Sequence, residues 1–226
     1  EIADRVVVMN GGEIVEQGSV REVYHNPQHP YTKKLIGAAP GKGEIKLLDG
    51  GAQLLLEANG LTKTYGSFHA LNGVSLTLAR GQSLAVVGES GSGKSITCHS
   101  MMRLLPFAPK IDGRILIDGK DVWGMTHPEI IAFRRKTVGM VFQDPLAALN
   151  PVRTIGSKML ATLRIYYPEA RKAELYERAV KSLQDVHIPQ AERRLEVYPH
   201  QLSGGLNQRV MIALALLGDP AMLIAD

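Results

Sequence analysis

Gly88, Gly93, Lys94 and Ser95 stand at the spacing G-x-x-x-x-G-K-S, which is typical of loops that bind the phosphates of a nucleotide. Glycine lets the backbone turn tightly, so that successive N–H groups and the positive end of the following helix face the phosphates. Lys94 would then reach the β- and γ-phosphates, and Ser95 would hold Mg²⁺. The alternative is a plain glycine-rich turn. With 23 glycines in 226 residues, a chance match at all four positions is on the order of a percent per chain.

Two elements must flank this loop if it is to face a ligand. The apolar run Leu84–Val87 is bounded by small and polar residues and is short enough for a buried parallel strand. The dozen residues after the loop have a helical pattern. A strand, a loop and a helix in this order are the setting that the motif requires, so the sequence predicts nucleotide binding.

Two further side chains are candidates for the same site. Asp226 ends an apolar strand expected at Ala221–Asp226, and a carboxylate at the carboxyl end of a strand beside a phosphate loop can bind Mg²⁺ and its water. Tyr65 precedes the predicted loop strand, where its ring could stack on a purine. Ordinary packing of Tyr65 is the alternative.

Composition narrows the class of protein. The net charge is +4 and the pI is near 9.2, but basic and acidic residues alternate along the chain, which favours solvated helix faces over a nucleic-acid surface. The single cysteine, Cys98, excludes a disulfide framework and fits a reducing compartment. No apolar run approaches the roughly 18 residues that span a bilayer. The first residue is not methionine and the last follows an apolar strand, so we expect the chain to be cut at both ends.

The remaining patterns predict how the chain is organised. Before a turn-rich linker at about residues 38–50, we expect a hairpin of Arg5–Met9 and Glu13–Glu16, a short helix capped by Ser19 and Glu22, and a second helix from His29 to Ile36. After the linker we expect strands at Leu54–Glu57 and Leu71–Leu78 around a turn at 65–67, a hairpin over Gly113–Val122, a helix over Pro128–Arg135, and a strand over Val138–Phe142 that ends in Gln143.

A helical insertion follows that strand. Thr154–Tyr166 and Glu169–Val186 have helical patterns, and Leu175, Ala179 and Leu183 form one apolar stripe at the spacing i, i+4, i+8. The segment 202–205, Leu-Ser-Gly-Gly, then precedes a strongly apolar helix.

Four motifs, taken in order, resemble those of an ABC transporter ATP-binding subunit. Gly88–Ser95 resembles the Walker A motif, Gln143 the Q-loop, 202–205 the signature, and Met222–Asp226 the Walker B motif. Ser203 lies 23 residues before Asp226, which leaves room for one helix and one strand. Four short segments are similar to those of the peptide, oligopeptide and nickel importers within this family. They are Gln143–Leu146, Leu149–Pro151, Tyr198–Gln201 and His29–Thr32.

The resemblance implies an α/β fold. It would have a P-loop NTPase (RecA-like) core, an antiparallel β subdomain and a helical insertion at about residues 145–205, and it would be incomplete at the C-terminus. Residues 1–40 are similar to the end of a preceding ATP-binding domain, 41–51 would be the linker, and 52–226 look like the front of a second copy. We therefore expect a piece of a tandem protein; a rearranged single domain is the alternative.

The resemblance also implies a mechanism in which two domains close face to face over two ATP molecules. Hydrolysis would release them, and the insertion would pass the movement to a membrane permease. Lys94, Gln143 and Asp226 would be catalytic, and Ser95, Gln143 and Asp226 would hold Mg²⁺. The ATP-binding residues would be Tyr65, Gly88, Ser90, Gly91, Ser92, Gly93, Lys94, Ser95 and Ile96, with Ser203, Gly204 and Gly205 reaching the γ-phosphate across the interface.

The implied protein is the ATP-binding subunit of an importer of peptides or similar small solutes. Its partners would be a second ATP-binding domain, transmembrane permease subunits and, indirectly, a solute-binding protein, with no nucleic acid. It would lie at the cytoplasmic face of the inner membrane. The cargo is not encoded in this chain.

Two departures from the family pattern affect this expectation. Leu206 replaces the glutamine that commonly follows the signature glycines, and the chain ends before the glutamate that family members place after the Walker B aspartate. We therefore expect ATP hydrolysis by the full-length protein, but only weak nucleotide binding by this polypeptide. The competing interpretations are a kinase or small GTPase, an ABC-type ATPase acting on ribosomes or DNA, and an inert, partly folded module.

Overall fold

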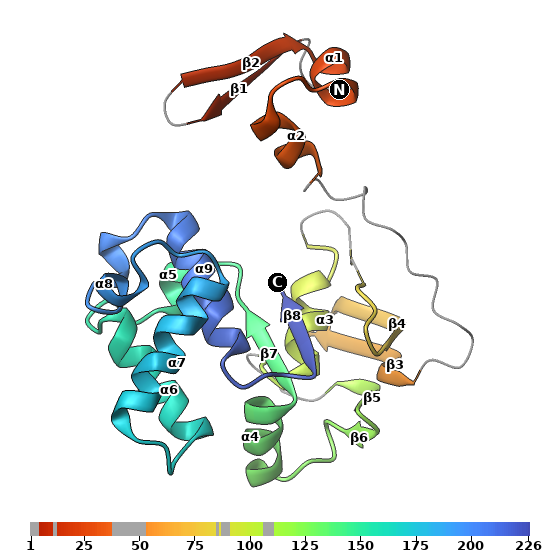
Figure 1. Cartoon of the computed structure of the whole chain (residues 1–226). Helices are drawn as coiled ribbons and strands as arrows, with labels where there is room; N and C mark the ends of the chain where they lie inside the picture. The colour runs from red at the N-terminus through yellow and green to blue at the C-terminus, as the bar shows by residue number, and fades with distance from the viewer. Residues whose placement is uncertain (1–4, 11–12, 38–52, 85, 87–90, 106–110) are drawn as a thin grey trace. The chain divides into compact units, whose positions relative to one another are not determined.

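The computed structural model describes residues 5–10, 13–37, 53–84, 86, 91–105 and 111–226 (Figure 1). The chain divides into two compact units, Glu1–Asp49 and Gly50–Asp226. The predicted linker at 41–51 lies outside the described residues. No helix in the described part of the chain has the length and apolar character needed to cross a bilayer.

The first unit is a hairpin followed by two helices. Strand β1 (Arg5–Asn10) pairs antiparallel with β2 (Glu13–Ser19), and helices α1 (Val20–His25) and α2 (Pro30–Gly37) follow. The predicted cap is confirmed: the Ser19 hydroxyl accepts from the Glu22 N–H at 3.2 Å, and the Glu22 carboxylate accepts from the Ser19 N–H at 3.1 Å.

A four-stranded antiparallel sheet opens the second unit. Its order is β4-β3-β5-β6, formed by β3 (Leu54–Tyr65), β4 (Phe68–Ala79), β5 (Asp112–Ile117) and β6 (Lys120–Asp121). Strands β3 and β4 are each 12 residues long, so they extend well beyond the predicted four- and eight-residue strands. The reason is that Gly60 and Gly73, with φ of 61° and 68°, accompany shifts of register that disturb the alternation of apolar and polar residues.

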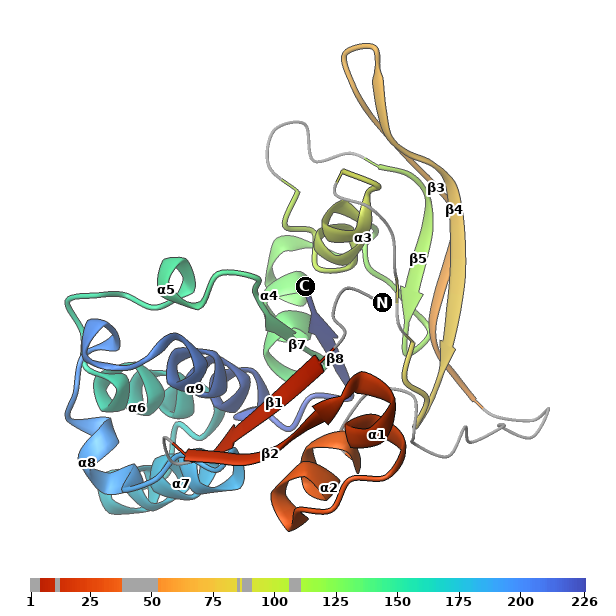
Figure 2. The ribbon, with the colours of Figure 1, turned by 90° about the horizontal axis from the view of Figure 1, so that it is seen from above.

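Two helices and a pair of parallel strands form the next part of this unit. It contains helices α3 (Lys94–Met101) and α4 (His127–Lys136) and the parallel pair β7 (Val138–Val141) and β8 (Met222–Ala225). Figure 2 shows α3 between the antiparallel sheet and the β7–β8 pair. One apolar cluster joins all of them, since Ile115, Met101 and Met140 all belong to it. This cluster fixes α3 against the carboxyl ends of the parallel strands.

The helical insertion forms a second apolar cluster. Leu175, Ala179 and Leu183 are at most 2% exposed at its centre, which confirms the predicted stripe. Its elements are α5 (Pro145–Ala148), α6 (Ile155–Tyr166), α7 (Lys172–Asp185), α8 (Ala191–Leu195), a 3₁₀ turn at Pro199–Gln201 and α9 (Gly204–Leu216).

The predicted strand at Leu84–Val87 differs from the structure where its residues are described. Leu84 and Val86 belong to no strand and are 46% and 48% exposed, while residues 85 and 87 lie outside the described part. An apolar run forms a parallel strand only beside another strand that completes its hydrogen bonds. Among the described residues β7 and β8 pair only with each other, so this run has no described strand beside it.

Candidate functional site

Gly93 shapes the turn into α3. It is the N-cap of the helix with φ of 95°, a left-handed conformation that favours glycine. A Cβ atom placed there would lie 2.7 Å from the carbonyl oxygen of Ala70 and 2.9 Å from the Leu71 side chain on β4. The close approach of the loop to β4 therefore requires glycine at this fixed position of the motif.

The first turn of α3 fixes the residues that follow. The Lys94 ammonium lies 3.3 Å from the Ser92 hydroxyl. The buried Thr97 hydroxyl donates to the Gly93 carbonyl at 2.9 Å, and the Ser100 hydroxyl donates to the Thr97 carbonyl at 2.7 Å. These bonds satisfy hydroxyls inside the core and hold the start of the helix, with Lys94 and Ser95 at its N-terminal end.

The parallel pair places two other predicted residues side by side. Val141 is paired with Ala225 in register, and the Asp226 N–H donates to the Val141 carbonyl at 3.0 Å. Gln143 follows the end of β7 by two residues, and Asp144 caps α5 by accepting from the N–H groups of the next turn. The carboxyl ends of both strands thus present Gln143 and Asp226 at one edge.

Ser95, Gln143 and Asp226 line a single hollow, together with His99, Phe142, Asp144, Ala147 and Ala148. The structure therefore brings together the three residues predicted to hold Mg²⁺. A hydroxyl, an amide oxygen and a carboxylate are the hard oxygen ligands that Mg²⁺ prefers, so this donor set fits the ion. The hollow has a volume of about 520 Å³ and is open to solvent.

His99 is a site residue that the sequence reasoning missed. Its Nε2 lies 3.4 Å from the Asp226 Oδ2, and its ring lies 6.4 Å from that of Phe142. The available signal was its spacing, because His99 follows Ser95 by four residues and so shares its helix face. Nearby, burial and then the Asp226 charge raise the pKa of the Cys98 thiol.

Tyr65 ends β3 beside the turn at Gly66. Its ring is half-buried, and the ammonium of Lys63 lies 4.8 Å from the ring centre. Lys63 itself is only 3% exposed and pairs in register with Leu71, whose side chain a Cβ at Gly93 would meet. Stacking of Tyr65 on a purine stays a prediction.

The signature segment is separate from this hollow. Ser203 caps α9, its hydroxyl accepting from the Leu206 N–H at 3.4 Å. Gly204 and Gly205 are exposed with open space around them, and none of the three lines the hollow of Ser95. Leu206 is partly buried against the second apolar cluster. The N–H groups at the start of α9 are therefore accessible to an anion that lies outside the hollow.

The positions of the remaining predicted ATP-binding residues say little about nucleotide binding. Gly88 and Ser90 lie outside the described residues. Gly91 has φ of 82°, again a conformation suited to glycine. Ile96 is partly buried and packs against the first apolar cluster, a position that by itself indicates a core role.

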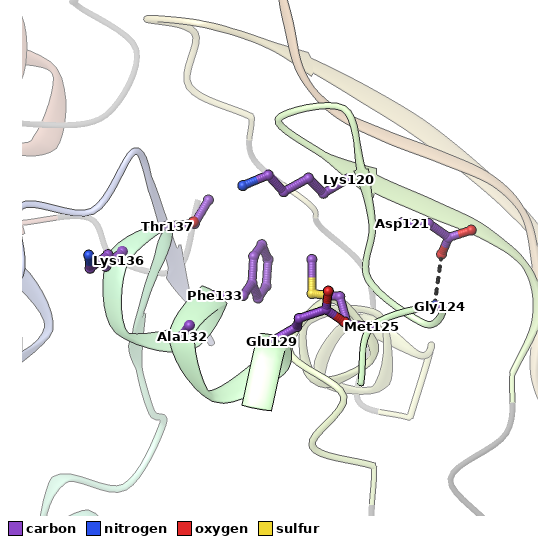
Figure 3. A pocket seen from close by; sticks show the side chains of 9 residues that line it. All are labelled: Lys120, Asp121, Gly124, Met125, Glu129, Ala132, Phe133, Lys136 and Thr137. Carbon is purple, nitrogen blue, oxygen red and sulfur yellow. Dashed lines mark hydrogen bonds between the residues drawn. The ribbon is translucent and has the colours of Figure 1, made fainter. Parts of the chain in front are cut away.

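A second hollow lies between β6 and α4 (Figure 3). Its volume of about 530 Å³ is close to that of the first, so size does not choose between them. Phe133 and Met125 lie at its centre in Figure 3, with Lys120 and Glu129 on either side. Its Glu129 carboxylate is engaged by Thr126, which lowers the Glu129 pKa. Among its lining residues there is no residue of the predicted phosphate loop and none from the carboxyl ends of β7 and β8, so the chemistry favours the first hollow.

Comparison with protein families gives two matches. Residues 71–226 match the family model described as "ABC transporter". Residues 15–57 match a model described as "Oligopeptide/dipeptide transporter, C-terminal region". The two matched segments do not overlap, and the C-terminal type precedes the other along the chain.

The chain is also similar in sequence to curated transport proteins. The oligopeptide transport ATP-binding protein OppD of Salmonella typhimurium is 40% identical over 179 residues, which cover 77% of this chain and 53% of the relative. The glutathione import ATP-binding protein GsiA of Escherichia coli is 35% identical over 268 aligned residues, covering 100% of this chain and 41% of that protein. The chain thus spans about half the length of the curated relatives it matches.

A solved structure shows the same fold. The dimeric, post-hydrolysis structure of the ATP-binding cassette MJ0796 bound to ADP and Pi has a TM-score of 0.67 and 32% identity. The match covers 76% of this chain and 73% of that one. This similarity confirms the predicted α/β fold of the P-loop NTPase type.

Proposed function

Because the chain belongs to the ABC transporter family, we propose that it is part of the ATP-binding subunit of an importer for peptides or similar small solutes. The shared hollow of Ser95, Gln143 and Asp226 is the observation that carries the proposal. A phosphate loop alone is common to many enzymes, but here the loop helix and the carboxyl ends of two parallel strands meet around one space that contains Ser95, Gln143 and Asp226.

Each residue has a role that follows from its chemistry. The Lys94 ammonium neutralises the β- and γ-phosphates, and the N-terminal N–H groups of α3 donate hydrogen bonds to the phosphate oxygens. The hydroxyl of Ser95, the amide oxygen of Gln143 and the carboxylate of Asp226 hold Mg²⁺. The ion supplies neutralisation of charge on the phosphates during transfer. Gln143 also orients a water at the edge of the hollow, because it lies on the segment that leads into the helical insertion.

The signature segment acts on a second site. Ser203, Gly204 and Gly205 do not reach the hollow of Ser95, yet they offer N–H groups at the start of a 13-residue helix. A γ-phosphate bound by another ATP-binding domain is a ligand of matching charge. The structural relative MJ0796 is a dimer in its complex with ADP and Pi, which supports a face-to-face pair.

A tandem protein explains the order of the matched segments. A C-terminal type of importer segment at residues 15–57 precedes the segment at 71–226, as it would where one ATP-binding domain follows another in one polypeptide. The alignment with GsiA, which runs along the whole chain, supports the same order. The partners of such a protein are transmembrane permease subunits and, through them, a solute-binding protein, and its place is the cytoplasmic face of the membrane.

Nucleotide binding tests this proposal directly. A fluorescent ATP analogue is titrated into the chain with Mg²⁺, and Lys94→Ala and Asp226→Asn are compared with Lys120→Ala. Lys120 lines the second hollow and serves as the matched surface lysine. Binding should fall at least about tenfold in Lys94→Ala and stay unchanged in Lys120→Ala, since only Lys94 contacts phosphate. Equal affinity in Lys94→Ala and the parent contradicts the proposal.

A further inference from the structure

His99 connects the loop helix to the Walker B strand. It lies on α3 one turn after Ser95, and its Nε2 lies 3.4 Å from Oδ2 of Asp226, the residue that follows β8. Both residues line the hollow that also contains Ser95 and Gln143. The Asp226 side chain is 11% exposed and that of His99 is 30% exposed, so the contact is partly shielded from water.

The two oxygens of the Asp226 carboxylate therefore have different surroundings. Oδ2 is the oxygen that lies 3.4 Å from the imidazole Nε2, and Oδ1 is the other oxygen of the same carboxylate. A histidine donates from Nε2 both as the neutral tautomer protonated there and as the imidazolium, so the contact does not depend on the charge of the ring. A carboxylate held through one oxygen presents the other in a fixed direction, which is how partners of metal ligands act.

The imidazole is itself held in place. Its backbone belongs to α3, whose first turn is fixed by the bonds between Thr97 and Gly93, and its ring packs near Phe142 at the end of β7. The ring thus contacts residues that follow both parallel strands while its main chain is part of the helix that begins at the phosphate loop.

We propose that His99 is a positioning residue that orients the Asp226 carboxylate toward the Mg²⁺ held with Ser95. The inference rests on the proposed function, because it concerns the metal that accompanies the nucleotide. It assigns to His99 no contact with the nucleotide and no role in proton transfer. Loss of the imidazole should weaken the binding of Mg²⁺ and leave the affinity for nucleotide without Mg²⁺ unchanged.

The test separates these two affinities. A fluorescent ATP analogue is titrated into the full chain in EDTA, and the Mg²⁺ dependence of its binding is then measured. The variants are His99→Leu, which removes the donor, and His99→Gln, whose amide N–H lies near the place of Nε2. His127→Leu is the matched control, since His127 is an exposed histidine at the start of α4, away from the hollow.

We expect His99→Leu to need about tenfold more Mg²⁺ than the parent or His127→Leu for the same enhancement of binding, the usual cost of losing a partner of a metal ligand. Its affinity in EDTA should equal that of the parent, and His99→Gln should recover most of the Mg²⁺ response. A parental Mg²⁺ response in His99→Leu overturns the inference, and so does an equal loss in EDTA, which indicates general disruption. Failure of His99→Gln to recover any response also overturns it. If the parent itself binds no nucleotide, the proposed function fails, and this inference fails with it.

Discussion

The backbone N–H of Asp226 donates to the carbonyl oxygen of Val141 across the β7–β8 pair at 3.0 Å. This bond continues the parallel ladder by one residue beyond the last paired position, Val141 with Ala225. Asp226 is therefore placed by the sheet rather than by a loop, and Gln143 begins its segment from the same edge. A change in the packing of β7 should consequently affect the positions of both Gln143 and Asp226.

A substitution of Gly139 can change how β7 packs against α9. A Cβ atom there would lie 2.5 Å from the carbonyl oxygen of Ala215 on α9 and 3.0 Å from the Pro220 ring. Gly139→Ala should therefore push β7 away from α9 and lower the free energy of unfolding by about 1–3 kcal/mol, the usual cost of overpacking. Urea denaturation measures this change. Gly124→Ala is the control, because its Cβ would meet only ordinary contacts of 3.6 Å or more, and equal stability of both variants would contradict the prediction.

Gly93 should be equally intolerant, but with a functional result. Alanine at φ of 95° is strained, and its Cβ would collide with the Ala70 carbonyl oxygen at 2.7 Å. Because Ala70 belongs to β4, the loop must move away from the sheet and lose its arrangement of N–H groups. We expect Gly93→Ala to abolish measurable binding of a fluorescent ATP analogue while circular dichroism stays close to that of the parent. Parental affinity would show that the loop tolerates the shift.

The sequence predicted the elements whose signals are local. The capping box of Ser19 and Glu22, the stripe of Leu175 and its neighbours, and the strand that begins at Val138 all depend on residues close in the chain. The full length of β3 was hidden because Gly60 allows a shift of register, and a shifted strand no longer alternates.

The site shows the same division between local and distant signals. The spacing of Lys94 and Ser95 is a local pattern, and so is the apolar strand before Asp226. The contact of His99 with Asp226 joins residues 127 positions apart. Only the packing of α3 against the β7–β8 pair brings them together, and no period in the sequence encodes a distance of that kind. Whether Leu84 and Val86 form a strand likewise depends on a neighbouring strand, not on their own apolar character.

Asn207 should support the start of α9. It is 1% exposed, and its amide donates to the Pro199 carbonyl at 2.9 Å and to the Leu202 carbonyl at 3.4 Å. These bonds tie the 3₁₀ turn to the helix whose N-cap is Ser203. Asn207→Leu keeps the volume but leaves both carbonyls without this donor, so the free energy of unfolding should fall by about 1–3 kcal/mol. Thermal denaturation measures the loss, with the exposed neighbour Gln208→Leu as control; unchanged stability of Asn207→Leu would argue against this role.

Cys98 reports on the charge of the Asp226 carboxylate. Burial raises the pKa of its thiol, and the Asp226 carboxylate raises it further because a nearby negative charge disfavours the thiolate. A raised pKa means a smaller thiolate fraction at a given pH, and only the thiolate reacts with iodoacetamide. Alkylation of Cys98 at pH 8 should therefore be slower than that of a free thiol, and its rate should climb only at higher pH.

Asp226→Asn separates charge from burial in that experiment. The substitution removes the negative charge with little change of volume, so the pKa of Cys98 should fall toward its ordinary value and alkylation at pH 8 should accelerate. Burial of the thiol is the same in both proteins, so access alone cannot produce the difference. The measurement is the rate of iodoacetamide incorporation between pH 7 and pH 10, followed by mass spectrometry. Identical pH profiles for the parent and Asp226→Asn would mean that the carboxylate does not act on Cys98.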